Sequence, residues 1–257
     1  MTDTPVPSPT AAVLIIGNEV LSGRTKDANL SHIAAALTGI GVPVREARVV
    51  PDVEEEIIAA LDALRRRYTY VFTTGGIGPT HDDITAACVA KAFGVPLERN
   101  AEAVARLARH YNDPAMLNEA RLRMANIPAG AVLIDNPISQ APGFRIENVH
   151  VLAGVPRIMQ AMLDGLLPKL QGGPAIHART VSCALGEGAI ATDLAAIQGR
   201  FPTVDIGSYP YFRNGFFGVS LVVRGTDETA VEAATTDIAG MIAALGDTPA
   251  VTVGTAE

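Results

Sequence analysis

A glycine-rich turn is the segment of this sequence whose residue types are best suited to chemistry. It runs from Thr74 to Thr85, reads TGGIGPTHDDIT, and joins an apolar strand to the start of an expected helix. Gly75, Gly76 and Gly78 let the backbone approach a ligand closely and adopt positive φ, while the following helix offers unpaired N–H groups and the positive end of its dipole. The turn therefore predicts a cradle for a phosphate or another anion, with Thr80 as a further contact.

Two well-known phosphate loops do not describe this turn. No Gly-Lys-Ser/Thr follows, as a Walker loop requires, and the glycine spacing is not the G-x-G-x-x-G of a dinucleotide-binding turn. Glycines also occur at strand-to-helix turns for steric reasons alone. The residues beside the glycines must therefore decide between a ligand site and a purely structural turn.

Carboxylates stand directly beside the cradle. Asp82 and Asp83 come where the next helix begins, and we expect one of them to cap that helix. A carboxylate next to a phosphate repels it unless a cation bridges the two groups, so Mg²⁺ or another divalent metal is implied. Asp83 together with Asp52, which follows a neighbouring strand, would suffice as protein ligands, although Asp52 could equally cap a helix. His81 could act on a phosphate, but we favour a solvent-facing position for it.

More polar residues follow the first expected strand. Asn18, Glu19, Ser22 and Asn29 lie in or beside the loop GNEVLSGRTKDAN. Ligands of open α/β sheets bind outside the carboxyl ends of the strands, so these four residues are candidate ligand contacts, although Asn29 could instead cap its helix.

The sequence offers no candidate nucleophile for covalent catalysis. Cys88 and Cys183 sit in apolar runs without a nearby His or second Cys, so each is expected to be a buried, reduced thiol. No G-x-S-x-G motif is present either.

The elements that position these residues alternate between strand and helix. Apolar runs and helical stripes predict three β-α units in succession, which imply a parallel sheet with right-handed crossovers. The expected strands are 11–16, 42–50, 70–73, near 132 and 149–152, and the expected helices are 30–37, 53–64, 84–93, 101–110, 114–124 and 156–167.

A Pro- and Gly-rich segment, 168–174, divides the chain into a domain at 11–170 and a smaller one at 175–257. The smaller domain is expected to have strands at 179–184, 204–209, 216–223 and 250–253 and helices at 190–199 and 228–245. That βαββαβ order is typical of ferredoxin-like α+β modules. Residues 1–10 are expected to form a flexible terminus.

Composition limits the partners. The 257 residues carry a formal net charge of −7, which disfavours DNA or RNA, whose phosphates would be repelled. No run reaches the roughly 18 apolar residues of a membrane span, and no signal peptide precedes the first strand. A cytoplasmic protein that contacts neither nucleic acid nor membrane is expected.

Four segments together resemble a known family. GNEVLSGRTKDAN, TGGIGPTHDDIT, NPISQAPGF and LAGVPRIMQAM are similar to the molybdopterin-binding (MoaB/Mog-like) domain in its competence/damage-inducible protein A (CinA) version, over residues 11 to about 170. The motif T-G-G-x-G-P-T-x-D-D-x-T is long, and it occurs in the expected strand-turn-helix setting. The segment VDIGSYPYFR at 204–213 looks like the small domain of short CinA-type proteins, and the amidohydrolase domain of longer ones is not expected here.

The resemblance implies a three-layer α/β/α domain with a mostly parallel sheet, which usually forms a homo-oligomer (dimer or trimer). It implies that the glycine-rich turn holds the phosphate of a pterin or nucleotide, and that the aspartate matching Asp83 is essential, with the one matching Asp52 implicated beside it. Family members adenylylate molybdopterin, insert molybdate, or cleave the pyrophosphate of ADP-ribose-like nucleotides with a metal ion. A related domain accompanies FAD synthase.

Two positions depart from the family pattern. The CinA string P-G-V-P-x-E-M is replaced here by residues 153–159, with Ala153 for the first proline and Ile158 for the acidic residue. A module that binds a pterin or nucleotide without transforming it is therefore an alternative to a metal-dependent enzyme. A third hypothesis, an RNA- or protein-interaction role for the smaller domain, lacks a basic aromatic motif.

Overall fold

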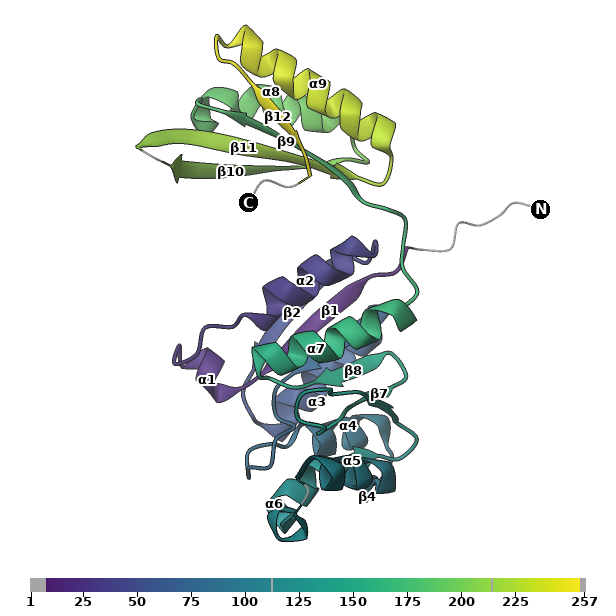
Figure 1. Cartoon of the computed structure of the whole chain (residues 1–257). Coiled ribbons are helices and arrows are strands. Elements are labelled where there is room, and N and C mark those ends of the chain that lie inside the picture. Colours follow the sequence, from purple (N-terminus) through teal and green to yellow (C-terminus); the bar gives the residue numbers. More distant parts are fainter. Residues whose placement is uncertain (1–7, 112, 214, 255–257) are drawn as a thin grey trace, which may run out of the picture. The chain divides into compact units, whose positions relative to one another are not determined.

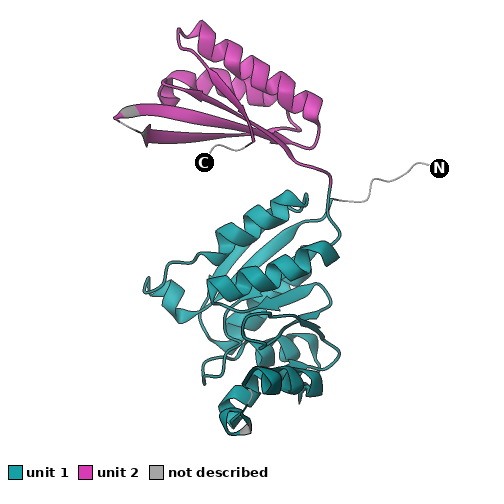
Figure 2. Cartoon of the chain, in the orientation of Figure 1, with its two compact units in different colours: residues 1–173 teal, residues 174–257 magenta. Residues whose placement is uncertain are grey.

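The computed structural model describes residues 8–111, 113–213 and 215–254. The chain divides into two compact units, unit 1 (residues 1–173) and unit 2 (residues 174–257), which are coloured separately in Figure 2. Each unit is described by itself. Most of the flexible terminus expected at 1–10 lies outside the described residues.

Unit 1 is built on a six-stranded sheet with the order β2-β1-β3-β8-β7-β6 (Figure 1). The first four strands in this order are parallel, and β7 and β6 run antiparallel to their neighbours. The strands of this sheet are β1 Ala11–Ile16, β2 Val44–Val50, β3 Tyr70–Thr74, β6 Val132–Ile134, β7 Gly143–Ile146 and β8 Val149–Leu152. A separate antiparallel pair consists of β4 Leu97–Arg99 and β5 Asn126–Pro128.

Helices cover both faces of this sheet. The helix α2 (Asn29–Gly39) packs with α7 (Pro156–Leu166) on one face, and α3 (Glu54–Arg65), α4 (Thr85–Phe93) and α5 (Ala101–Tyr111) contribute to the core of the other. Every residue of β1 is buried, and alternate residues enter the two cores. The predicted three-layer α/β/α domain with a mostly parallel sheet is thereby confirmed.

One predicted helix is wrong. Residues 114–124 form a 3₁₀ turn (Pro114–Met116), the short helix α6 (Glu119–Leu122) and a second 3₁₀ turn (Arg123–Ala125). The reason is Asn118, whose side chain accepts the N–H of Arg121 and starts a new helix at this point. Strand β7 was not expected either, because Pro142 and the turn residues around it obscure its short apolar pattern.

Unit 2 has the predicted βαββαβ order. Its elements are β9 His177–Cys183, α8 Glu187–Arg200, β10 Asp205–Arg213, β11 Phe216–Gly225, α9 Glu228–Ala244 and β12 Ala250–Val253. The antiparallel sheet has the order β10-β11-β9-β12, and a core of its own lies between it and the two helices. The smaller α+β domain is thereby confirmed.

Two further properties concern the whole described chain. Cys88 and Cys183 are both buried free thiols, as expected. None of the helices within the described ranges is both long enough and apolar enough to cross a membrane.

Candidate functional site

The carboxyl ends of β1, β3 and β8 meet at one edge of the parallel sheet, as their neighbouring positions require (Figure 1). Gly17, Gly75 and Ala153 are the residues that directly follow these strands. A cavity of about 460 Å³ opens at this edge, lined by the glycine-rich turn, the loop after β6 and the start of α7. Its position agrees with the general location of ligands in open α/β sheets.

The glycines of the turn are required by its packing. Gly75 and Gly76 have φ angles of 101° and 67°. A Cβ atom at Gly75 would lie 2.1 Å from the carbonyl oxygen of Ile16, and one at Gly76 would lie 2.2 Å from Oγ1 of Thr85. Thr85 closes the turn, because its Oγ1 donates to the carbonyl of Gly75 and its N–H to that of Gly76. Only glycine fits at these two positions.

Consecutive backbone donors of the turn remain unused. Within the described part of the chain, the N–H groups of Gly76, Ile77 and Gly78 donate to no protein acceptor. All three residues line the cavity. Successive free N–H groups in a turn are a known form of anion site. The phosphate cradle itself stays a prediction.

Thr80 holds Asp83 against the turn. Oδ2 of Asp83 accepts the N–H of Thr80 at 2.7 Å and its hydroxyl at 2.5 Å. A Cβ atom at Gly78 would lie only 2.7 Å from the same oxygen, so the missing side chain there makes room for the carboxylate. Asp83 is half-buried and lines the cavity.

The expected capping of α4 by Asp82 or Asp83 is wrong. The helix starts at Thr85, and no side chain caps it. Oγ1 of Thr80 also lies 2.6 Å from Oδ1 of Asp82, so its one hydrogen is shared between the two carboxylates, and this contact lowers the pKa of the exposed Asp82 carboxyl. Thr80 therefore draws both carboxylates back into the turn, and only Asp83 reaches the cavity.

Asp52 and Glu19 lie differently relative to the main cavity. Oδ2 of Asp52 accepts the N–H of Asn18 at 2.9 Å, so Asp52 caps the short helix α1 (Asn18–Leu21) and not its own helix α3. Asp52 lies outside the cavity lining, whereas Glu19 shares that lining with Asp83. The Glu19 carboxylate lies over Gly17, where a Cβ atom would approach it to 2.6 Å.

The cavity lining offers a divalent cation two carboxylates. The described residues include no group of three or more His, Cys, Asp or Glu side chains placed to hold a metal ion by themselves. Two carboxylates, Glu19 and Asp83, do face one cavity, and no Lys or Arg lines it. Mg²⁺ is commonly held by one or two carboxylates together with ligand phosphates and water. The role of Asp52 as a metal ligand stays a prediction.

Asn29 lies beside the turn in a smaller cavity of about 50 Å³, which Thr74 also lines. Its Nδ2 donates to the carbonyl of Gly154 at 2.8 Å. Its Oδ1 and Oγ1 of Thr74 are buried and have no hydrogen-bond partner among the described residues. The alternative that Asn29 caps its own helix is wrong. The N–H of Leu30, in the first turn of α2, donates to the Asp27 side chain instead. Two unpaired polar atoms in so small a space suit a water molecule or a polar ligand atom.

The remaining predicted contacts lie farther out. Ser22 donates to the carbonyl of Glu19, and Asn18 is exposed at the start of α1. Neither lines the main cavity or the smaller one.

Sequence reasoning missed Asn136, Ser139 and Thr25, which line the main cavity. Asn136 is buried and holds its own turn, because Nδ2 donates to Ser139 Oγ at 2.7 Å and to the Ala141 carbonyl at 2.8 Å. The Asn-Pro pair at 136 and 137 signals a turn. Nothing in the sequence tells which strand end that turn approaches. Ala153 and Ile158, which depart from the family pattern, also line the cavity.

Comparisons with known proteins agree with this geometry. Residues 12–172 match the family described as a probable molybdopterin binding domain, and residues 175–246 match the one described as the middle domain of FAD synthase. A protein of Pyrobaculum calidifontis is 37% identical over 212 residues, which are 79% of this chain and 81% of that protein. A protein of Pyrococcus abyssi is 36% identical over 237 residues, or 86% and 92% of the two chains.

A solved structure is also similar. The crystal structure of CinA from Thermoplasma acidophilum, a protein described as having unknown function, superposes with a TM-score of 0.60 and 36% sequence identity. The match covers 63% of this chain and 98% of that one. That share of this chain is close to the share matched by the molybdopterin-binding family.

Proposed function

Because the chain belongs to the family of probable molybdopterin binding domains, we propose that its main cavity binds a pterin or a nucleotide through a phosphate group. The observation that carries this proposal is the row of unused N–H groups at Gly76, Ile77 and Gly78, which opens into a cavity of about 460 Å³. Phosphate oxygens accept several hydrogen bonds at once, and the start of α4 adds the positive end of its dipole. A cavity of this size also accommodates a ring system beside the phosphate.

The two carboxylates that line the cavity, Glu19 and Asp83, favour binding of a metal ion together with the ligand. Glu19 and Asp83 would repel a phosphate, and no Lys or Arg in the lining offsets their charge, so a divalent cation such as Mg²⁺ binds together with the ligand. The cation, when bound, neutralises charge on the phosphate oxygens and polarises the phosphorus for attack. Asp83, fixed by two hydrogen bonds from Thr80, would hold the cation beside the phosphate. Asp52 holds α1, the helix that carries Glu19, and is also proposed to contact the cation.

This arrangement supports phosphoanhydride chemistry. In hydrolysis of an ADP-ribose-type nucleotide, a water oxygen bonds to one phosphorus, the bond from that phosphorus to the bridging oxygen breaks, and two monophosphates are released. In adenylyl transfer, the phosphate of molybdopterin replaces water as the attacking group on the α-phosphorus of ATP, and pyrophosphate leaves. The free N–H groups stabilise the charge that develops on the phosphate oxygens in either reaction.

Asp83→Asn tests the proposal against Asp82→Asn as the matched control. The purified variants are incubated with ADP-ribose, with FAD, and with ATP plus molybdopterin, each in the presence of Mg²⁺ or Mn²⁺. Asp83→Asn should lower turnover about a hundredfold or more, because it removes a charge that holds the cation beside the reacting phosphate. Asp82→Asn should stay within a few-fold of wild type, since its exposed carboxylate lies outside the cavity. Equal turnover in both variants would exclude the assignment of Asp83.

A second candidate function is binding without turnover. It is favoured by Ile158, which stands where the family pattern has an acidic residue and which lines the cavity. Calorimetry with the same ligands and metals separates the two functions: binding with no product in any reaction supports a carrier or sensor. Absence of binding by all of these ligands would contradict both candidates.

A further inference from the structure

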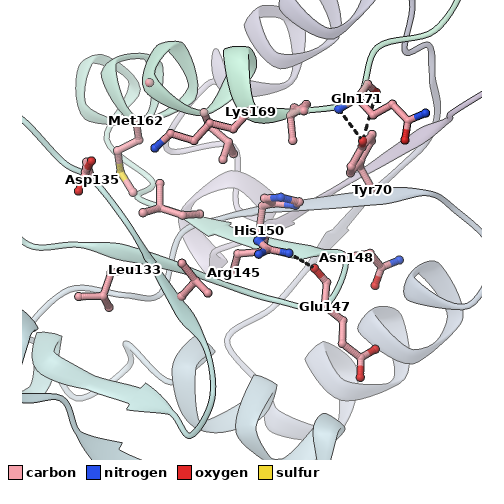
Figure 3. A pocket seen from close by; sticks show the side chains of 15 residues that line it. Tyr70, Leu133, Asp135, Arg145, Glu147, Asn148, His150, Met162, Lys169 and Gln171 are labelled. Atoms are coloured by element: carbon pink, nitrogen blue, oxygen red, sulfur yellow. Dashed lines mark hydrogen bonds between the residues drawn. The ribbon is translucent and has the colours of Figure 1, made fainter.

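Unit 1 contains a second cavity, of about 450 Å³, shown from close by in Figure 3. It is lined by β6 and by residues near the starts of β3 and β8. Tyr70, the first residue of β3, lines it, whereas the glycine-rich turn follows the last residue of that strand. His150, near the start of β8, also lines it, as do Met162 and Leu166 of α7. The two cavities share no lining residue.

A buried histidine forms part of the wall. The side chain of His150 is 2% exposed, and its ring stacks on Phe72 with centroids 5.0 Å apart. Its Nδ1 atom has no hydrogen-bond partner within the described residues. A buried polar atom without a partner is unusual unless water or a ligand satisfies it, and the adjoining cavity provides the space.

Two cations of the wall lack a carboxylate partner. No ion pair to Lys169 or Arg145 occurs in the described part of the chain, and Arg145 donates only to the backbone carbonyl of Glu147 at 3.1 Å. Figure 3 shows Lys169 on one side of the cavity, with its amino group towards Met162, and His150 and Arg145 on the other side. Asp135 and Glu147 also line the cavity: Asp135 pairs with Arg106 at 2.5 Å, and Figure 3 shows the Glu147 carboxylate pointing away from Lys169 and His150.

The rest of the wall is apolar and held in place. Val132, Ile134 and Leu170 line it together with Met162 and Leu166. The segment after α7 is fixed over β3, because the Tyr70 hydroxyl donates to the Gln171 carbonyl at 3.1 Å and accepts its N–H at 3.0 Å. The cavity is therefore a formed site with one cationic side and one apolar side.

We propose that this cavity binds a small organic anion, with its acidic group between Lys169 and Arg145 beside His150 and its apolar body against Ile134, Met162 and Leu166. A charge-assisted contact to Lys169 and Arg145 supplies orientation, and removal of the apolar body from water supplies most of the affinity. The site is separate from the proposed phosphate site and does not depend on it.

A plugged variant tests the location. Gly165 is exposed in α7 and lines the cavity, and a Cβ atom there would meet nothing within 4 Å. Gly165→Leu therefore fills the space without displacing a neighbour, and leucine favours the helix more than glycine does. Gly199→Leu is the matched control, since Gly199 is also an exposed helix glycine with open space around its Cβ position, but in unit 2.

The probe is anilinonaphthalene sulfonate, an aromatic anion, titrated by fluorescence into the full chain and compared with the neutral N-phenylnaphthylamine. Wild type and Gly199→Leu should bind the anion alike, and Gly165→Leu should bind it about tenfold more weakly or not at all. Lys169→Gln should weaken the anion about tenfold and leave the neutral probe unchanged. Probe bound at exposed aromatic side chains such as Phe212 and Phe217 would appear equally in every variant.

Three outcomes would overturn the proposal. In the first, Gly165→Leu binds the anion as wild type does. In the second, Lys169→Gln weakens the neutral probe and the anion equally, so that charge plays no part. In the third, light scattering shows that Gly165→Leu alone changes the molar mass in solution, which would mean that a second copy of the chain covers this cavity.

Discussion

Thr80 gives two adjacent carboxylates different roles. Its hydroxyl contacts both Asp82 and Asp83, but its N–H donates only to Asp83. Asp83 is thereby held in the cavity lining, while its neighbour stays in solvent. A single small polar residue thus decides which of two equivalent side chains can act on a ligand.

His150 provides a prediction about stability and pH. Burial, with a smaller contribution from the charge of Arg145, lowers the pKa of His150 from 6.5 to about 4. The unfolded chain then binds a proton more readily than the folded one between these values. The titration of this histidine therefore adds no pH dependence above pH 6.5, and the folded state loses stability as the pH falls towards 4, by up to about 3 kcal/mol.

Urea unfolding of wild type and His150→Gln at several pH values between 7.5 and 4.5 measures this contribution. Titrations common to both proteins cancel in the difference, so the free energy of unfolding should fall more steeply with decreasing pH in wild type. Parallel curves for the two proteins would show that His150 is not held neutral by the fold.

At the scale of elements, the glycine-rich turn is built by contacts to two other elements. The carbonyl of Ile16 at the end of β1 fixes Gly75, and Thr85 at the start of α4 fixes Gly76. These contacts belong to the fold itself. The same backbone arrangement leaves the neighbouring N–H groups free for a ligand.

Gly76→Ala separates backbone strain from steric conflict when it is compared with Gly23→Ala. Both glycines have positive φ, 67° and 71°, but a Cβ atom at Gly23 would meet nothing within 4 Å, whereas one at Gly76 would lie 2.2 Å from Thr85. Gly23→Ala should cost about 1–2 kcal/mol from strain alone. Gly76→Ala should cost about 1–3 kcal/mol more, because Thr85 must move. Chemical denaturation measures both, and equal losses would show that the turn adapts without cost.

The elements that the sequence predicted well are those whose pattern is local. The apolar run of β1 and the stripe of Ile33 and Leu37 in α2 were located from neighbouring residues alone. The strand β7 and the break at Asn118 were missed, because the first is short and the second depends on one side-chain hydrogen bond.

The candidate site divides in the same way. Gly75, Gly76, Gly78 and Asp83 stand in one contiguous string, so their proximity followed from the sequence. Asn136 and Ser139 reach the cavity only because β6 lies in the same sheet, a fact of topology that spacing does not express. The hydrogen bond from Asn18 to Asp52 was equally hidden, since it joins segments 34 positions apart.

At the scale of the whole molecule, the two units have separate cores. Unit 1 has one core on each face of its sheet, unit 2 has one, and no buried residue is shared between the units. The division falls between Gly173 and Pro174. Each unit is also larger than the smallest chains that fold alone.

Expressed separately, residues 1–173 and 174–257 should each unfold cooperatively in urea. The fragment 1–173 should bind nucleotide as the full chain does, since every residue of the proposed site lies within it. Circular dichroism and calorimetry check these two expectations. An unfolded fragment 174–257, or a fragment 1–173 that no longer binds a ligand of the full chain, would show that the units depend on each other.

The unused N–H groups of the glycine-rich turn have a consequence for the way in which a ligand arrives. The backbone around Gly76 is already fixed by Thr85 in the free protein, so the residues that carry the free donors line the cavity before any phosphate is present. The conformational entropy of the turn is lost during folding and not during binding. Such a preorganised site exchanges water for phosphate oxygens without rearranging its own backbone, and it selects ligands by the shape of their anionic group.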